Sequence, residues 1–218
     1  MSSVMYCARG GMPVGRGRPR VFDEKQALDA ALDIFWRCGY QGASLTELTR
    51  AMGIAKPSLY AAFGNKEQLY LAALQRYRER QLSRHAEALA AEPDLKEAMR
   101  RFLRSVATML TAPELPGGCM VVNTAVSCDR GALPQRVIAA IGETVDQSAF
   151  GLLKERLREE LHRRNLPHDT PIEQLADYFT AIMSGMAVMA KMGVSEDRLF
   201  DTIEHALCVL PAPSKEPH

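Results

Sequence analysis

Two cysteines with the potential for thiol chemistry, Cys119 and Cys128, lie in the segment "PGGCMVVNTAVSCD". Cys119 follows two glycines and is predicted to lie at a helix N-terminus, where the helix dipole favours the thiolate. Nine residues of helix would place the two sulfurs on opposite faces and about 13 Å apart along the axis, too far for a disulfide within one intact helix. Two alternatives follow: a reactive thiol at Cys119, or two small buried hydrophobic side chains.

Cationic side chains form a second group, in the Gly- and Pro-rich segment before residue 20. Arg16-Gly17-Arg18-Pro19, followed by Arg20, has the core of an AT-hook. Gly permits close backbone approach, Pro keeps the chain extended, and Arg seeks the negative potential of a narrow minor groove in A·T tracts. The alternative is a basic tail that makes nonspecific phosphate contacts.

The charge of the chain is unevenly distributed. Residues 1–80 contain 12 Lys or Arg and 7 Asp or Glu, whereas residues 81–218 contain 15 and 19. A basic first third joined to an acidic remainder predicts that only the N-terminal part contacts a polyanion. Hydroxyls and cations near helix N-termini suit phosphate oxygens in particular, because the free N–H groups there point outward.

Several classes of protein are excluded by what the sequence lacks. No stretch approaches 18 uninterrupted apolar residues, so a membrane span is not expected. The 5 cysteines have no CxxC spacing, which predicts reduced thiols and a cytoplasmic protein. Gly-rich phosphate loops, HExxH, GxSxG and paired carboxylates are missing, and the 5 histidines are scattered. We therefore expect no enzyme activity, no cofactor and no metal site.

Short helices are predicted to position the N-terminal groups. Asp23 caps a helix that Gly39 ends, and Ser44, with Glu47 at capping-box spacing, opens a second helix that Gly53 stops. A third helix covers about residues 55–62, with Pro57 in its first turn. Asn65 caps a fourth helix that runs from residue 66 to about 89. Two short helices joined by a Gly-containing turn are the geometry of a helix-turn-helix.

Longer amphipathic helices are predicted beyond Pro93. They cover about residues 94–111, 119–128 and 134–164, followed by one that Thr170 caps and one that Ser195 caps. The helix after Thr170 repeats apolar residues at steps of three and four, including Phe179, and the last helix does so through Ile203. We expect these two helices to form the dimer surface, as a four-helix bundle with the partner's pair. No strand pattern occurs, so the fold class is all-α.

The segment from Asp23 to Leu74 closely resembles the DNA-binding domain of TetR-family regulators. The matching pieces are "ALDIFWRCGYQGASLTELTRAMGI", the recognition helix "SLYAAF" and the start of the fourth helix, "NKEQL". The resemblance implies that Ser44 and Thr46 touch the DNA backbone and that Tyr60 and Lys66 grip phosphates. It also implies that Lys56, Pro57 and Ser58 face base edges or adjacent phosphates. Two departures from the family are Pro57-Ser58 in place of Gly-Thr, and Ala62 in place of a His.

This resemblance gives a domain plan. Residues 1–20 are a basic arm, 21–68 a three-helix helix-turn-helix domain, 69–212 a larger C-terminal helical domain for effector binding and dimerisation, and 213–218 a tail. The amphipathic pattern of the helices suggests a partly apolar effector pocket, although every candidate lining residue could equally belong to the hydrophobic core. Its candidate residues are Phe102, Val106, Met109, Cys119, Val122, Asn123, Val126, Phe150, Tyr178 and Met183.

The expected function is that of a homodimeric repressor on a palindromic double-stranded DNA operator, released by a small molecule. One alternative is a repressor that senses electrophiles or oxidants through Cys119. Another is an architectural protein that bends DNA, although such proteins need little beyond a basic surface and this chain carries a large acidic domain.

Overall fold

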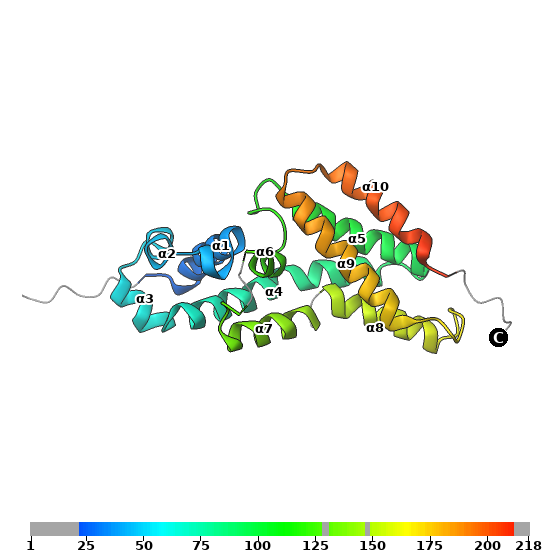
Figure 1. Cartoon of the computed structure of the whole chain (residues 1–218), viewed down its shortest axis with the longest axis horizontal. Coiled ribbons are helices and arrows are strands. Elements are labelled where there is room, and N and C mark those ends of the chain that lie inside the picture. Colours follow the sequence, from blue (N-terminus) through cyan, green and yellow to red (C-terminus); the bar gives the residue numbers. More distant parts are fainter. Residues whose placement is uncertain (1–21, 128–130, 147–148, 212–218) are drawn as a thin grey trace, which may run out of the picture.

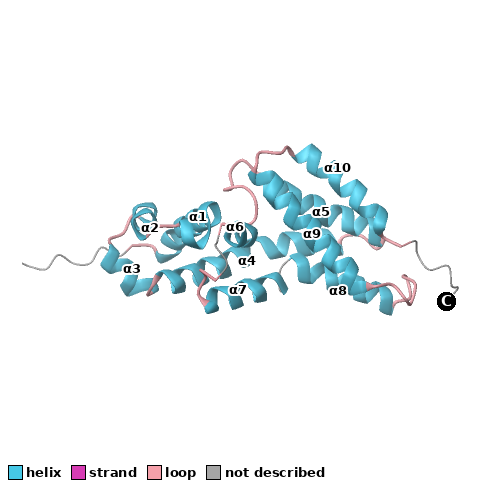
Figure 2. Cartoon of the chain, in the orientation of Figure 1, coloured by secondary structure: helices cyan, strands magenta, loops and turns pink. Residues whose placement is uncertain are grey.

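The computed structural model describes residues 22–127, 131–146 and 149–211. Every regular element in these residues is helical (Figure 2), in agreement with the predicted all-α class. The molecule is elongated, with helices α1, α2 and α3 at one end and a bundle of the later helices at the other (Figure 1). The arm that carries Arg16, Arg18 and Arg20 lies outside the described residues, as does Cys128.

The N-terminal end consists of α1 (Glu24–Gly42), α2 (Leu45–Met52) and α3 (Lys56–Phe63). Asp23 caps α1 by accepting hydrogen bonds from two backbone N–H groups, and Ser44 caps α2 by accepting one from the N–H of Glu47. Gly53 adopts the left-handed conformation after α2, with φ 67°, where a side chain would be strained. These ends confirm the predicted caps.

One helix, α4 (Lys66–Ala90), runs from the N-terminal end into the bundle (Figure 1). Asn65 and Gln68 form a reciprocal capping box at its start. The remaining helices are α5 (Leu95–Thr111), α6 (Met120–Val126), α7 (Gln135–Asp146), α8 (Ala149–His162), α9 (Ile172–Lys191) and α10 (Glu196–Ala206), followed by a 3₁₀ turn at Leu207–Val209.

Two predicted boundaries are wrong, and a third needs an addition. Regular helical geometry stops at Gly39, as predicted, but a short helical piece follows across the kink and extends α1 to Gly42. The predicted helix 134–164 is two helices, because the buried positions of α7 and those of α8 are out of phase. Val137 and Leu153 are both buried, yet 16 residues of continuous helix would turn them about 160° apart. Thr170 does not cap α9: its hydroxyl donates to the carbonyl of Pro167, and Pro171 takes the cap position.

Aromatic side chains pack α1 against the first half of α4. Trp36 and Phe35 of α1 are fully buried, together with Tyr70 of α4. The rings of Phe35 and Tyr70 meet edge-to-face at 5.1 Å, and those of Trp36 and Tyr77 at 4.7 Å. Such pairs favour this geometry because the positive edge of one ring faces the negative face of the other. Helix α1 is thus packed firmly against α4, and it also packs against α6.

Candidate nucleic-acid interface and the junction that positions it

The exposed face of α2 and α3 carries most of the residues predicted to contact DNA. Lys56 and Pro57 are exposed in the first turn of α3, and Ser58 is half-buried beside them. Tyr60 projects from the same helix with 48% of its surface exposed, which is unusual for a tyrosine in a folded domain. Leu59 between them is fully buried and fixes which face of α3 points outward. The arrangement is a short helix, α3, with one exposed face and one buried face.

Helix α2 adds hydroxyl groups to this face. Ser44 and Thr46 are both exposed at its start, although the Ser44 hydroxyl oxygen is already engaged as the cap. Arg50 is exposed four residues after Thr46, so the two side chains share one face of α2. No described residue pairs with Arg50. The sequence analysis missed this residue, and the signal that could have found it is its spacing from Thr46.

Lys66, at the start of α4, is held beside the end of α1. Its ammonium lies 4.7 Å from the centre of the Tyr40 ring and 3.5 Å from the carbonyl oxygen of Gln41. A cation over an aromatic ring is attracted to the ring's negative face. The side chain is therefore half-buried and held at one position.

A buried hydrogen-bond network fixes the N-terminal end against α6. The indole N–H of Trp36 donates to the carbonyl of Gly118 over 2.9 Å. In return, the amide of Asn123 donates to the carbonyl of Trp36 over 2.8 Å and to that of Gly117 over 3.1 Å. Tyr70 adds a buried bond from its hydroxyl to Thr124 over 3.0 Å. Because buried polar groups are costly when unpaired, this network specifies one arrangement of α1 on α6.

The kink in α1 lies at the same contact. Gly39 has φ 70° and ψ 179°, and a Cβ there would lie 2.3 Å from the Ser127 hydroxyl and 3.2 Å from the Asn123 carbonyl oxygen. Glycine is required for both reasons, backbone conformation and close approach. The sequence analysis assigned Gly39 to a helix end, and its contact with α6 could not be inferred from local pattern.

Cys119 borders this network. Its sulfur accepts a hydrogen bond from the Tyr77 hydroxyl over 3.3 Å, and the side chain is half-buried. Burial raises the pKa of Tyr77 well above its ordinary value, so the hydroxyl stays protonated and remains a donor. Cys119 occupies the cap position of α6, as the sequence predicted.

The residues proposed to line an effector pocket are only partly brought together. Phe102, Val106 and Met109 are buried on α5, Val122 and Asn123 on α6, and Met183 on α9. Val126 is 67% exposed and Tyr178 36% exposed, so these two face outward. Phe150 lies in α8, and its side chain is outside the described part of the chain. Both N–H groups of the Asn123 amide are already used by backbone carbonyls.

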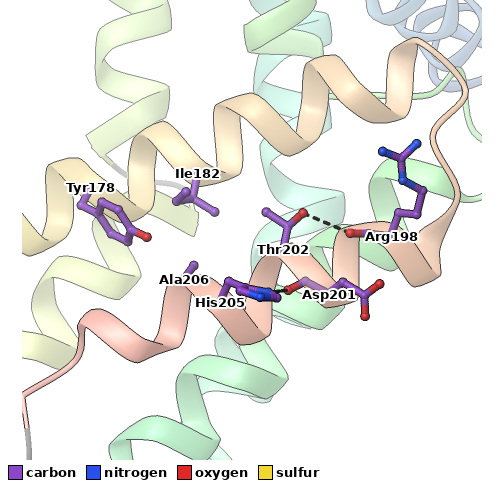
Figure 3. A pocket seen from close by; sticks show the side chains of 7 residues that line it. All are labelled: Tyr178, Ile182, Arg198, Asp201, Thr202, His205 and Ala206. Carbon is purple, nitrogen blue, oxygen red and sulfur yellow. Dashed lines mark hydrogen bonds between the residues drawn. The ribbon is translucent and has the colours of Figure 1, made fainter.

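Two surface pockets are found elsewhere. One, of about 460 Å³, lies between α9 and α10 (Figure 3). Its lining residues are Tyr178, Ile182, Arg198, Asp201, Thr202, His205 and Ala206. The other, of about 810 Å³, lies at the end of α8 around Arg164 and His168. In the described residues, no cluster of three His, Cys, Asp or Glu side chains could hold a metal ion.

Comparison with known proteins identifies the family. A model described as "Bacterial regulatory proteins, tetR family" matches residues 27–73, and one described as "Tetracyclin repressor-like, C-terminal domain" matches residues 96–206. This chain belongs to the TetR family. The two matches fall on the helix-turn-helix end and on the bundle of this TetR-family chain.

Individual relatives of this TetR-family chain match along most of their length. It is 32% identical to the HTH-type transcriptional repressor ComR of Escherichia coli K12, over 90% of this chain and 92% of that protein. It is 30% identical to the HTH-type transcriptional regulator YezE of Bacillus subtilis, over 89% and 99%. A solved structure of a cysteine mutant of the TetR-family regulator CifR, complexed with 26-bp operator DNA, superimposes with a TM-score of 0.81 at 37% identity, covering 89% of this chain and 100% of that one. No helix among the described residues is long and apolar enough to cross a membrane.

Proposed function

We propose that this TetR-family chain is a transcriptional repressor that binds a palindromic double-stranded operator as a homodimer and is released by a small molecule. The exposed face of α2 and α3 carries this proposal, because it presents Lys56, Tyr60 and Thr46 on a buried base. The CifR relative was solved in complex with operator DNA, which supports DNA binding by this chain. Arg50 joins the interface as a phosphate contact, and Arg16, Arg18 and Arg20 supply the minor-groove contact of the arm.

The experiment begins with selection of operators from random duplex DNA by the full chain. Tyr60→Ala and Lys56→Ala should each weaken binding to the selected operator at least about tenfold, as for loss of a contact at the recognition helix. Lys96→Ala is the matched control, because Lys96 is exposed on α5 at the other end of the molecule. Unchanged affinity in both α3 variants would overturn the assigned surface.

Release by a small molecule is tested with the selected operator. Ligands that raise the melting temperature of the protein should also dissociate it from the operator, because binding to one conformation shifts the equilibrium between the two. Ligands that stabilise the protein without releasing DNA, together with bent DNA in the complex, would favour the architectural alternative.

A second candidate for the effector chemistry is an electrophile that reacts with Cys119. The observation that favours it is the position of the sulfur, half-buried beside the buried network that joins α1 to α6. In the reaction the thiolate sulfur adds to an electrophilic carbon of an enone or maleimide, and the resulting carbanion takes a proton from water. The adduct would crowd the contact with Tyr77 and displace the segment that holds Trp36.

N-ethylmaleimide is the probe. Peptide mass analysis should show that Cys119 is labelled before Cys38 and Cys208, and labelling should release the operator from the parent but not from Cys119→Ser. If the parent and Cys119→Ser release DNA alike, the thiol mechanism is wrong and the reversible small-molecule effector stands.

A further inference from the structure

An apolar stripe on the outer face of α9 has no partner among the described residues. It consists of Tyr178, Ala181, Gly185, Val188 and Met192, spaced at alternating steps of three and four. Met192 is 78% exposed and Val188 38% exposed. A Cβ built on Gly185 would meet nothing within 4 Å, so the backbone at the centre of the stripe is open to close approach by another helix. This stripe, and not the buried residue Phe179, is the face that a second copy can cover.

Helix α10 borders the same face. The pocket between α9 and α10 is lined by Arg198 and Asp201, one turn apart on α10 (Figure 3). Both side chains are exposed, point away from each other, and form no ion pair or side-chain hydrogen bond with a described residue. Opposite charges left unpaired beside an apolar stripe are complementary to the same surface of a second copy, when that copy is related by a two-fold rotation.

Symmetry places these two charges near the dimer axis. In a two-fold dimer, a residue i that touches residue j of the partner is repeated by j touching i. The stripe is centred on Gly185, so the axis passes near that residue. Helix α10 runs antiparallel to α9, and its turn between Thr202 and Ala206 lies across from Ile182 (Figure 3). Counting about one turn onward along α9 and one turn back along α10 then puts Arg198 and Asp201 near the level of Gly185. Residues 198 and 201 are then related to one another across the axis.

We propose that Arg198 pairs with Asp201 of the partner subunit, twice in each dimer, and that this reciprocal pair makes the chain select a second copy of itself. This inference rests on the homodimer of the proposed function. Pairs at the edge of an apolar interface contribute more to the choice of partner than to affinity, because mismatched partners bring like charges together. A related chain with a different charge at either position would be rejected.

The experiment uses two charge reversals of the full chain. Arg198→Asp and Asp201→Arg should each weaken homodimerisation at least about tenfold, because each creates two like-charge contacts per dimer. An equal mixture of the two variants should form a heterodimer with close to the parent's dissociation constant, since every contact is then between opposite charges. The double variant carrying both reversals should also recover the homodimer. Sedimentation and native mass spectrometry of differently tagged chains measure all three.

Matched controls and a separate variant distinguish the possible failures. Arg164→Asp and Asp169→Arg reverse exposed charges between α8 and α9 and should leave the dimer unchanged. Val188→Glu tests the stripe itself. If Val188→Glu gives monomers while both charge reversals remain dimers with the parent's affinity, the dimer face stands and the reciprocal pair is wrong. If the mixture and the double variant fail to recover dimers, the pairing is also wrong. If Val188→Glu leaves the dimer intact, the proposed dimer face itself fails.

Discussion

Lys66 is a cation that we propose contacts a DNA phosphate. The Tyr40 ring and the Gln41 carbonyl hold its ammonium before any DNA arrives, so little side-chain entropy remains to be lost on binding. We expect Lys66→Ala to weaken binding to all DNA sequences alike and to lower the slope of log K against log salt by about 1. Binding titrations at several salt concentrations measure this, with Lys96→Ala as the control. An unchanged slope would remove Lys66 from the interface.

Asn123 is the residue whose loss should most disturb the junction. Asn123→Leu leaves the buried carbonyl of Trp36 and the half-buried carbonyl of Gly117 without this donor, at a cost of roughly 1–3 kcal/mol for the buried group and less for the other. Asn123→Asp should destabilise the protein more, because an ionised carboxylate would face those two carbonyl oxygens. Denaturant unfolding measures both. Equal stability of the Asp variant and the parent would contradict the network as described.

For single residues, the sequence predicted those features that depend only on the local sequence pattern. The exposure of Lys56 and Tyr60 follows from the helical period of α3 and the family resemblance. The role of Asn123 does not, because its partner Trp36 lies 87 residues away in sequence and the bond depends on how α1 packs on α6. The sequence placed Asn123 only as a candidate pocket residue, and that assignment stays a prediction.

Among the helices, α1 has the strictest requirement for one residue type, the glycine at its kink. Gly39→Ala should cost roughly 1–3 kcal/mol, the range for a non-glycine residue held in a sparsely populated backbone region, with the approach to α6 adding to it. Gly53→Ala is the matched control, since Gly53 is also at positive φ but its Cβ would meet nothing within 4 Å. Thermal unfolding should show a larger loss for Gly39→Ala. A larger loss for Gly53→Ala would mean that the contact with α6 is looser than described.

An ion pair between α1 and α4 gives the stability of the fold a dependence on pH. Burial raises the pKa of Asp29, but the hydrogen bond from Arg76 and the charge of Arg80 outweigh it and leave the pKa below the ordinary 3.8. A carboxylate with a lowered folded pKa stabilises the protein above its unfolded pKa and loses that contribution as the pH falls through the folded value. Asp29→Asn should therefore be less stable than the parent at neutral pH, and the difference should shrink below pH 3.8. A difference that stays constant to lower pH would exclude this linkage.

Helix ends were predicted well where a capping side chain marks them, as at Asp23, Ser44 and Asn65. The division of residues 134–164 into α7 and α8 was missed. The apolar spacing in this segment is compatible with one long helix. Which face of each half is buried becomes known only when the neighbouring helices are in place.

For the whole molecule, the dimer predicts the behaviour on DNA. Val188→Glu should give monomers and lose operator binding without loss of helical structure, because two half-sites must be engaged together. Ile138→Glu on α7 is the control, with a similarly exposed aliphatic side chain outside the stripe. Light scattering and operator titration check the two effects. Monomers that bind the operator as tightly as the parent would exclude simultaneous binding of two half-sites by a dimer.

The helices of the proposed dimer were chosen from amphipathy, but the face of α9 that we propose for the dimer was not predicted. Phe179 and Ile203 are fully buried in the chain's own core, so charge placed there would unfold the protomer instead of separating two protomers. A regular apolar period identifies the most buried face of a helix. A second face, of small and exposed residues, can follow the same period, and it is recognised only when the packing of the first face is known.

The continuity of α4 has a geometric consequence for regulation. Its 25 residues form a rod about 37 Å long, with the helix-turn-helix at one end and the bundle around the other. A rotation of the rod by about 5° at its bundle end moves the far end by about 3 Å, close to the rise of one DNA base pair. In a two-fold dimer the displacement is applied twice, in opposite directions, so two recognition helices spaced for grooves about 34 Å apart would be carried roughly 6 Å out of step. A tilt too small to disturb a single hydrogen bond of α2 or α3 is then sufficient to spoil the fit to the operator.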